Sequence, residues 1–490
     1  MAHRLVLLLV VVADLLNLCQ GHGSHQARGN RPARALRFSW DTLPVFVHGS
    51  NSTGPVNKGA IELLARFSVV TIEKFQGECA NSGSPGPQCQ QEAAITDVLQ
   101  RVRMINPDVT TLFYYNSVIN FKQYAWDGDG FPQAQLLRNS SGDLITVEHN
   151  GPVSVFDFGQ AAARAEFIAE CANATNTGWV DGCFVDRVMD GSPCCIDAVG
   201  TAATSGAGGW KCAEPSSPLT AAQCLAYDQG HMDVVSNLTA AIAPGPIIAN
   251  HAFTTATDLY PDLNITGSMT ESLPADESGI SMLQWHAERG LAIEAHVGDC
   301  EPPGPGRTTV LAHFLIGAGR LAYFGCGAWS SSSDSWDDRW FEEFSRPLGP
   351  PVADAVKDNS TGVWTRSFDG VHGRTNVSWS ASTGGSIQWA GFPPPPPPPP
   401  PQPTRQCPSI ETNCAVDGKS GGPVGFSVAA WQHCCDICNK HAGSARADPC
   451  TAYRWTSVSR DGCTLYTGNV TLAGGGPAGS VCGKMARQYK

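Results

Sequence analysis

Short apolar runs and amphipathic segments alternate along the chain from about residue 40 to residue 330. A short apolar run bounded by turn residues predicts a buried strand, and an apolar period near 3.6 predicts a helix. The expected strands cover residues 43–48, 67–73, 110–116, a run starting at 182, 247–250, 267–271, 291–296 and 321–326. The expected helices cover residues 58–66, 92–105, 160–172, 221–243, 278–289 and 308–318.

This alternation predicts an α/β fold, a (β/α)8 TIM barrel, because eight strand–helix units fit in about 300 residues. A doubly wound open sheet is the alternative, although no glycine-rich phosphate loop follows the first strand. Residues 362–389 then alternate apolar and polar positions around glycine-rich turns, which predicts a small antiparallel β appendage.

Composition changes abruptly at Pro393, where an unbroken run of prolines reaches Pro401. Proline fixes φ and lacks an N–H, so we expect a stiff spacer rising about 3.1 Å per residue. A docking site for a proline-binding module is the other interpretation. We therefore expect a barrel domain (36–350), its β appendage (351–392), a polyproline linker (393–404) and a small disulfide-rich C-terminal module (405–490).

The N-terminus predicts export. Residues 5–18 are nearly all apolar, follow Arg4 and lead into polar residues, as in a signal peptide, which we place at residues 1–21. No later segment approaches the roughly 20 apolar residues that a membrane span needs. We expect a secreted, extracellular protein, with association to a cell wall as one form of that location.

The cysteines and the glycosylation motifs fit an oxidising, exported setting. Of the 19 cysteines, Cys19 lies within the predicted signal peptide, ten others precede the proline run and eight follow it, so we expect disulfides within each domain. Adjacent Cys194 and Cys195 are expected to bond different partners. Motifs for N-glycosylation occur at Asn51, Asn139, Asn173, Asn237, Asn264, Asn359, Asn376 and Asn469, where we expect surface positions.

The net charge of −12 disfavours nucleic acid and polyanionic ligands. Neutral or cationic partners fit better.

Two acidic residues end predicted strands and are the candidate catalytic pair. Asp186 closes the run GCFVD, and Glu271 follows GSMT. Since the C-terminal ends of barrel strands form the catalytic rim, both carboxylates are expected to face one pocket, as glycoside hydrolysis requires. The competing interpretation pairs Asp186 with Arg187 or makes it a helix cap; Asp190, four residues on, is a weaker catalytic candidate.

Other strand-end residues are candidate substrate contacts. Glu73 ends the second strand and can bind a sugar hydroxyl or form an ion pair with Lys74 or another base. Tyr115 and Asn116 end the third strand, where an aromatic ring and an amide suit sugar recognition.

Three histidines, His48, His251 and His296, follow the first, fifth and seventh strands. We expect each of these histidines either to contact a sugar or to pack inside the fold. The His-x-His pair of metal-dependent barrel hydrolases is missing, so we expect neither a metal nor another cofactor.

Tryptophans on the predicted rim loops are candidates for stacking on sugar rings. Trp126 lies in WDGDGF, and Trp329 begins a cluster with Trp336 and Trp340. Burial of each ring under its own loop is the alternative.

The barrel segment resembles secreted glycoside hydrolases related to endo-α-1,4-polygalactosaminidases and, more distantly, to α-galactosidases. The motifs GCFVDR, FYYNSV, WDGDGF, MTESL and VWTRSF followed by IQWA carry the resemblance. It implies that Asp186 is a nucleophile and Glu271 an acid/base. It also implies an α-linked substrate, for which we expect a neutral or amino-sugar polymer.

The C-terminal segment, with HCCDIC, PCTAYRW and GCTLY, resembles PAN/apple domains, which implies contacts with protein or carbohydrate. Zinc ligation by Cys434, Cys435, Cys438 and Cys450 is the competing interpretation. We therefore expect a glycoside hydrolase acting on an extracellular or cell-wall polysaccharide and carrying an adhesion module. The alternative is a non-catalytic glycan-binding or matrix protein that keeps a degenerate barrel.

Overall fold

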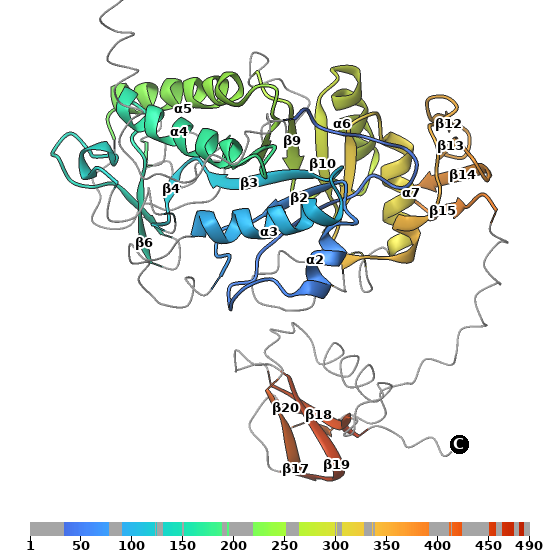
Figure 1. The fold of residues 1–490 in the computed structure, drawn as a ribbon. Helices are drawn as coiled ribbons and strands as arrows, with labels where there is room; N and C mark the ends of the chain where they lie inside the picture. The colour runs from blue at the N-terminus through green and yellow to red at the C-terminus, as the bar shows by residue number, and fades with distance from the viewer. Residues whose placement is uncertain are drawn as a thin grey trace, which may run out of the picture. The chain divides into compact units, whose positions relative to one another are not determined.

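A computed structural model describes much of the chain (Figure 1). The described residues are 34–77, 91–122, 124, 131–148, 151–188, 194–195, 219–250, 264–298, 300, 306–327, 336 and 339–391, with five further strands between 411 and 484 described as backbone. Contacts divide the chain into two compact units, Met1–Pro393 and Pro394–Lys490. The predicted signal peptide and polyproline linker lie outside the described residues.

Eight parallel strands form the centre of the first unit, in the sheet order β1-β2-β3-β7-β8-β9-β10-β11. Their bounds are β1 (Phe46–Gly49), β2 (Val69–Ile72), β3 (Thr110–Asn116), β7 (Gly182–Asp186), β8 (Ile247–Asn250), β9 (Gly267–Thr270), β10 (Ala292–His296) and β11 (Ala322–Gly325). Val45 pairs in parallel with Phe324, which joins the first strand to the last. The predicted (β/α)8 barrel is therefore confirmed, and an open doubly wound sheet is excluded.

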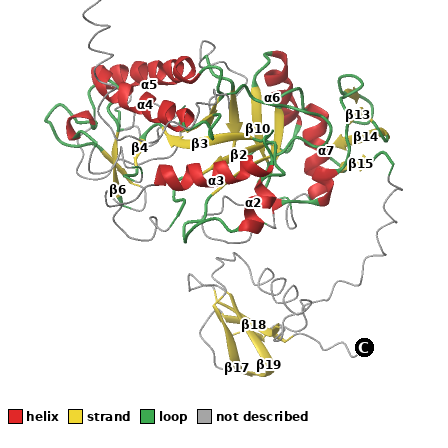
Figure 2. Ribbon diagram, in the orientation of Figure 1, coloured by secondary structure: helices red, strands yellow, loops and turns green. Residues whose placement is uncertain are grey.

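The predicted helices cover the outside of the barrel (Figure 2). They are α2 (Lys58–Leu64), α3 (Gln91–Ile105), α4 (Ala161–Asn176), α5 (Ala221–Ile242), α6 (Glu277–Glu288) and α7 (Arg307–Gly317). Side-chain caps fix several starts: Asn57 accepts from the Ala60 N–H, and Thr220 and Gln223 form a reciprocal capping box. Such caps orient each helix as the chain leaves the catalytic rim and returns to the opposite end.

Strand alternation sorts the buried side chains into two layers. One set fills the barrel interior: Phe46, Val69, Leu112, Tyr114, Phe184, Ile248, Met269, Ala292 and Tyr323. A larger set, including Phe113 and Tyr115, fills the space between strands and helices. Tyr114 and Tyr115, neighbours in sequence, therefore face opposite sides of β3.

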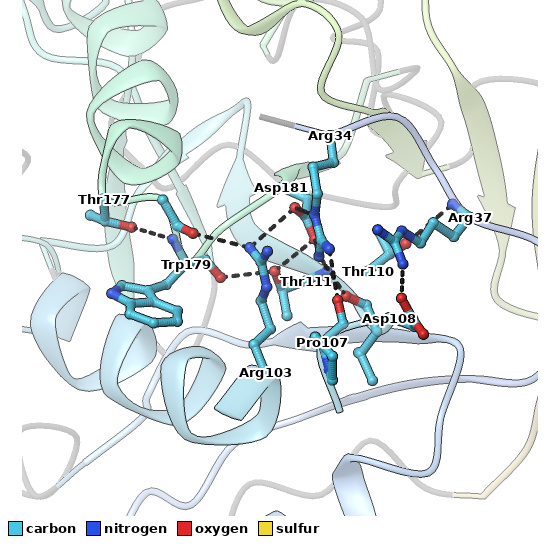
Figure 3. Close-up of polar contacts among 12 residues, drawn as sticks. Arg34, Arg37, Arg103, Pro107, Asp108, Thr110, Thr111, Thr177, Trp179 and Asp181 are labelled. Atoms are coloured by element: carbon cyan, nitrogen blue, oxygen red, sulfur yellow. Dashed lines mark hydrogen bonds and ion pairs between the residues drawn. The ribbon is translucent and has the colours of Figure 1, made fainter. Parts of the chain in front are cut away.

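A buried ionic cluster closes the end of the barrel where the strands begin (Figure 3). The Asp181 carboxylate accepts hydrogen bonds from Arg34 (2.9 and 3.1 Å), from Arg103 (3.2 Å) and from the N–H and hydroxyl of Thr111 (3.1 Å each). The segment before β1 is thereby fastened to β3 and α3, at the end opposite the rim.

Two antiparallel sheets are added to the barrel. The excursion between β3 and α4 contains the short helix η3 (Gln133–Gln135) and a sheet in the order β4-β6-β5, which the sequence pattern did not predict. Its strands are β4 (Ile119–Asn120), β5 (Thr146–Glu148) and β6 (Pro152–Val155).

The predicted β appendage is a four-stranded antiparallel sheet beside α7 (Figure 2). It contains β12 (Val356–Asp358), β13 (Val363–Gly370), β14 (Gly373–Ser380) and β15 (Gly384–Gln388), and the short helix η5 (Glu342–Ser345) precedes it. Arg366 on β13 donates to the main-chain oxygens of Leu315, Ile316 and Ala318 at the end of α7, 3.0, 3.3 and 2.5 Å away.

Three disulfides join pairs of described residues in the barrel domain. Cys171–Cys183 joins α4 to β7, Cys195–Cys224 joins the segment after β7 to α5, and Cys300–Cys326 joins the segments after β10 and β11. The prediction that Cys194 and Cys195 do not bond each other is confirmed.

The second unit contains a five-stranded antiparallel sheet in the order β16-β20-β18-β19-β17. The strands are β16 (Glu411–Thr412), β17 (Cys414–Pro423), β18 (Cys450–Thr456), β19 (Cys463–Gly474) and β20 (Ser480–Lys484). In the described parts of the chain, no helix is both long and apolar enough to cross a membrane.

Candidate active site

A cavity of about 210 Å³ lies at the C-terminal ends of the barrel strands. Both predicted catalytic acids line it, Asp186 at the end of β7 and Glu271 directly after β9. Its wall is made by Glu73, Lys74, Tyr114, Asn116, Phe121, Phe184, Asp186, Arg187, Asn250, Met269 and Glu271. Three carboxylates and two cationic side chains thus meet aromatic rings in one place.

The Asp186 carboxylate is surrounded by hydrogen-bond donors. Oδ2 accepts from the Tyr114 hydroxyl at 2.5 Å and from the Asn116 amide at 3.2 Å, and Oδ1 accepts from the Asn250 amide at 2.8 Å. These three donors come from β3 and β8, the two strands that flank β7 in the sheet. An ionised carboxylate accepts all three bonds, and its orientation is fixed by them.

Asn250 connects the two candidate catalytic acids. Its Nδ2 atom also donates to Glu271 Oε1 at 2.7 Å. Since one nitrogen lies 2.8 Å from Asp186 Oδ1 and 2.7 Å from Glu271 Oε1, these oxygens are at most about 5.5 Å apart. Asn250 ends β8, which lies between β7 and β9, so the sheet order itself puts one amide between the two acids.

The backbone of Asp186 is held as firmly as its carboxylate. Its carbonyl oxygen accepts from the Ser117 N–H at 3.0 Å and the Ser117 hydroxyl at 2.6 Å. The buried His231 lies 2.8 Å from that hydroxyl, and burial lowers the pKa of His231 to about 4. At neutral pH the uncharged imidazole donates from Nε2, because the Ser117 proton points to Asp186.

Arg187, next in the chain, adopts a left-handed conformation with φ of 68°. This region is costly for a residue with a Cβ, and such residues gather at functional sites where the surrounding contacts impose them. The reversal turns the chain immediately after Asp186 and brings Arg187 into the cavity wall.

Lys74 connects two walls of the cavity. Its ammonium donates to Glu73 Oε2 at 3.1 Å and to the Tyr114 hydroxyl at 2.9 Å, and it lies 4.1 Å from the centre of the Tyr114 ring. Burial alone raises the pKa of Glu73, but the charge of Lys74 and the hydrogen bond from His48 outweigh it and hold that pKa below its ordinary value. Glu73 therefore both lines the cavity and forms the ion pair that the sequence left open.

His48 lies behind Glu73, between two carboxylates. Its Nδ1 is 3.1 Å from Glu73 and its Nε2 is 2.9 Å from Glu294, a residue of β10 that is 1 % exposed. Burial lowers the pKa of His48, but Glu294 and then Glu73 more than compensate and raise it to about 9. His48 is a buried cation at neutral pH, and its main-chain oxygen accepts from Arg339 at 2.6 Å.

Three predicted substrate contacts lie elsewhere. Tyr115 faces the helices and packs on Phe167, because alternation along β3 turns Tyr114 and Asn116 inward. His48 is shielded from the cavity by Glu73. His296 is 5 % exposed and lies 2.9 and 2.8 Å from the main-chain oxygens of Glu271 and Gly327, so it joins the rim segments instead of lining the cavity.

The aromatic surface of the cavity comes from Tyr114, Phe121 and Phe184, not from Trp336 and Trp340, the two candidate tryptophans within the described residues. Trp336 is 2 % exposed and packs over Gly49, and Trp340 packs between Phe67 and Phe344. The candidates Trp126, His251 and Trp329, and also Asp190, lie outside the described residues.

Sequence reasoning missed Tyr114 and Asn250, and it named Lys74 only as an ion-pair partner of Glu73. Asn250 carried a usable signal, because it ends the fifth strand as Asp186 ends the fourth. Among the side chains that the structure describes, no group of three His, Cys, Asp or Glu residues is arranged to hold a metal ion.

A (β/α)8 barrel with two carboxylates that share one hydrogen-bond donor at the ends of its strands has the architecture of a glycoside hydrolase. Residues 103–372 match hypothetical glycosyl hydrolase family 15, and the chain belongs to that family. This membership confirms the predicted enzyme class, a glycosidase.

The chain is also similar to solved structures at low sequence identity. The glycoside hydrolase domain of PelA from Pseudomonas aeruginosa is 12% identical (TM-score 0.32), with 58% of this chain and 93% of that chain covered. The α-galactosidase from Lactobacillus brevis is 10% identical (TM-score 0.41; 92% and 56% covered), and the α-amylase from Geobacillus thermoleovorans is 6% identical (TM-score 0.39; 92% and 100% covered). No curated protein matches the chain.

Proposed function

We propose that the chain is a retaining glycosidase in which Asp186 is the nucleophile and Glu271 the acid/base. The observation that carries this proposal is the shared Asn250 nitrogen, which limits the two carboxylate oxygens to about 5.5 Å. Retaining enzymes place their carboxyl groups about 5–5.5 Å apart, whereas inverting enzymes need about 6.5–9.5 Å to admit a water molecule.

In the first step Asp186 attacks the anomeric carbon and the glycosidic C–O bond breaks, while Glu271 gives its proton to the departing oxygen. In the second step Glu271 takes a proton from water, the water oxygen bonds to the anomeric carbon, and the Asp186 carboxylate leaves. The proton returns to Glu271, so the cycle closes with one water consumed.

The substrate that fits best is a neutral or amino-sugar polymer in α linkage. Carboxylates outnumber cations around the cavity, which disfavours an acidic sugar, and Tyr114, Phe121 and Phe184 offer flat faces to a pyranose ring. The α preference comes from the family resemblance of the sequence motifs.

We also propose that the enzyme is secreted and that the segment 405–490, joined by the proline-rich linker, holds it on an extracellular or wall-bound glycan. The N-terminal apolar segment and the cysteine content support export. Tethering increases the effective concentration of a catalytic domain at an insoluble surface.

The test compares the parent with Asp186→Asn and Glu271→Gln on a panel of α- and β-linked polysaccharides, with NMR detection of the first anomer released. We expect turnover by the parent, loss of at least about a thousandfold in either variant, and a product that keeps the substrate's anomeric configuration. Azide added to Asp186→Gly should restore bond cleavage as a glycosyl azide. No turnover by the parent with binding intact in both variants would instead support a glycan-binding protein, and an inverted product would exclude Asp186 as nucleophile.

A further inference from the structure

Tyr114 is the only described side chain that contacts both Lys74 and the Asp186 carboxylate through its hydroxyl. The ammonium group of Lys74 has no lone pair to offer, so the phenol must accept from Lys74. Its single proton is thereby directed at Asp186 Oδ2, 2.5 Å away. The direction of both bonds follows from the chemistry of the groups alone.

The chain of contacts continues away from the cavity with alternating charge. Lys74 is held by Glu73, Glu73 by His48, and His48 by Glu294. Each link joins a cation to a carboxylate inside the barrel, where the low dielectric strengthens the attraction. The Lys74 ammonium therefore has a fixed position relative to the Tyr114 hydroxyl.

The protonation of Tyr114 supports this arrangement. Burial, followed by the nearby charges of Asp186 and Glu73, raises the pKa of Tyr114 well above its ordinary value, so the phenol keeps its proton. The charged groups that share the cavity with Asp186 come from several elements: Glu73 and Lys74 after β2, Arg187 after β7, and Glu271 after β9.

We infer that Lys74 and Tyr114 are positioning residues for the nucleophile: Lys74 orients the Tyr114 hydroxyl, and the hydroxyl holds the Asp186 carboxylate in its orientation toward the cavity. This inference rests on the proposed retaining mechanism and adds two residues to it. A hydrogen bond that polarises the next one strengthens both, so the two side chains act as one unit.

The experiment measures kcat and KM separately for the parent, Tyr114→Phe and Lys74→Met. Tyr124→Phe is the matched control, because Tyr124 is also buried and donates at 2.8 Å, but to the Tyr114 main-chain oxygen. We expect Tyr114→Phe to lose about a hundredfold in kcat while its KM stays within about threefold of the parent, because an aimed nucleophile matters in the transition state and not for substrate binding. Lys74→Met should lower kcat in the same way by less, and Tyr124→Phe should leave kcat unchanged.

Two different outcomes overturn the inference. If Asp186→Asn is inactive while Tyr114→Phe keeps the kcat of Tyr124→Phe, the positioning role is wrong and the proposed function stands. If the parent turns over no glycan, the proposed function fails and this role fails with it. Equal effects of Tyr114→Phe alone and of Tyr114→Phe with Lys74→Met would support the inference that Lys74 acts through Tyr114.

A second inference concerns the seven glycosylation motifs whose asparagine side chains the structure describes, and these fall into two groups. Asn51 is 2 % exposed: its Nδ2 donates to the Pro55 carbonyl at 3.1 Å, and its Oδ1 accepts from Thr53, the hydroxyl residue of the same motif. Asn139 is 4 % exposed, with Nδ2 3.1 Å from the Asp143 carboxylate and Oδ1 accepting from the Ser141 N–H. A glycan on either nitrogen has no path through the packed protein.

The exposed motifs lie elsewhere on the barrel domain. Asn173 and Asn237 are exposed near the C-terminal ends of α4 and α5, and Asn264 is exposed just before β9. Because the helices run back from the rim, these positions belong to the end of the barrel opposite the cavity. Asn51 and Asn139, by contrast, follow the carboxyl ends of β1 and β3, on the rim side. Asn359 and Asn376 are exposed on the appendage.

We infer that N-glycans occupy Asn173, Asn237, Asn264, Asn359 and Asn376 and that Asn51 and Asn139 remain unmodified, so the catalytic rim carries none at these motifs. Attachment replaces one amide N–H bond by an N–C bond to the first sugar. The C–O bond between that sugar and its lipid pyrophosphate carrier breaks, and the released lipid pyrophosphate takes up the proton. When their side-chain amides are unmodified, Asn51 and Asn139 keep the hydrogen bonds to neighbouring residues that stabilise their loops.

Expression through a eukaryotic secretory pathway, followed by enzymatic deglycosylation in ¹⁸O water and peptide mass mapping, tests this inference without reference to activity. We expect the ¹⁸O label at the five exposed asparagines and none at Asn51 or Asn139. Asn237→Gln should remove the mass of one glycan, whereas Asn139→Gln should remove none. Label at Asn51 or Asn139 in folded protein, or none at the exposed positions, overturns the inference.

Discussion

The side-chain nitrogen of Asn250 lies 2.8 Å from a carboxylate oxygen of Asp186 and 2.7 Å from a carboxylate oxygen of Glu271. It donates one of its two protons to each acid. One neutral amide thus reduces the repulsion between two acids that the proposed mechanism places at the same glycosidic bond. Replacing it by a third carboxylate reverses its effect, because like charges at this distance oppose each other's ionisation.

We therefore predict that Asn250→Asp lowers kcat/KM by at least a hundredfold, the range typical of a lost preorganised donor. Asn250→Ala, which removes the donor without adding charge, should lose less. Steady-state kinetics at neutral pH, with thermal unfolding as a check of folding, measures both. Activity within threefold of the parent in Asn250→Asp would show that the amide is not needed.

His48 should make stability depend on pH at the alkaline side. Its pKa is about 9 in the folded protein and near 6.5 when unfolded, so its contribution is present in full below about pH 6.5 and is lost as the pH rises through about 9. The shift corresponds to roughly 3 kcal/mol. The charged and titratable groups around it are Glu73, Glu294, Arg339 and His296.

Denaturant unfolding at pH 6.5 and pH 9.5 checks this. The free energy of unfolding of His48→Gln should fall below that of the parent by about 3 kcal/mol at pH 6.5, and the difference should shrink at pH 9.5. A difference that is the same at both values would show that the imidazole is uncharged in the fold.

Asp181→Asn should destabilise the barrel by about 3–5 kcal/mol, the cost of breaking a buried ion pair. Asp181 is buried with Arg103, and the variant leaves two guanidinium groups facing a neutral amide (Figure 3). Asp108→Asn is the control, because its pair with Arg37 is exposed and such pairs contribute at most about 1 kcal/mol. Chemical denaturation gives both values, and equal effects of the two substitutions would contradict the prediction.

Non-reducing peptide mapping should recover the pairs Cys171–Cys183, Cys195–Cys224 and Cys300–Cys326. Cleavage in the proline-rich linker without reductant should also release two separate fragments, because we expect no disulfide between the domains. A single covalently linked product would refute the separate pairing.

The strands of the barrel were predictable because parallel strands are buried on both faces and read as continuous apolar runs. The same property hides which way each side chain points. In FYYN, either tyrosine is apolar enough to face the barrel interior or the helices. We predicted that Tyr115 faces the cavity because it is closer to the strand end. Since side chains alternate along a strand, Tyr114 is the tyrosine that shares the inward direction of Asn116. The alternation of side chains along a strand therefore predicts which way a residue points better than its closeness to the strand end does.

Contacts between distant segments were beyond a single sequence. His48 and Glu294 are 246 residues apart, and nothing local in either segment marks the other as its partner. His48 therefore looked like a candidate sugar contact, although it is a buried cation. Asp186 and Glu271 were found because both follow a rule about position in a known fold, and the same rule applied to Asn250 would have found it as well.

The bonds from Arg366 to the last turn of α7 set a limit on how this enzyme can be divided. The carbonyl groups at that helix end have no partner within the helix, and a residue about 50 positions later in the chain supplies it. A fragment ending at residue 350, just past the eighth strand unit, would leave those carbonyls and the face of α7 open to water. The smallest piece that recombination can transfer, or that a protein engineer can excise, therefore extends through the appendage to about residue 391.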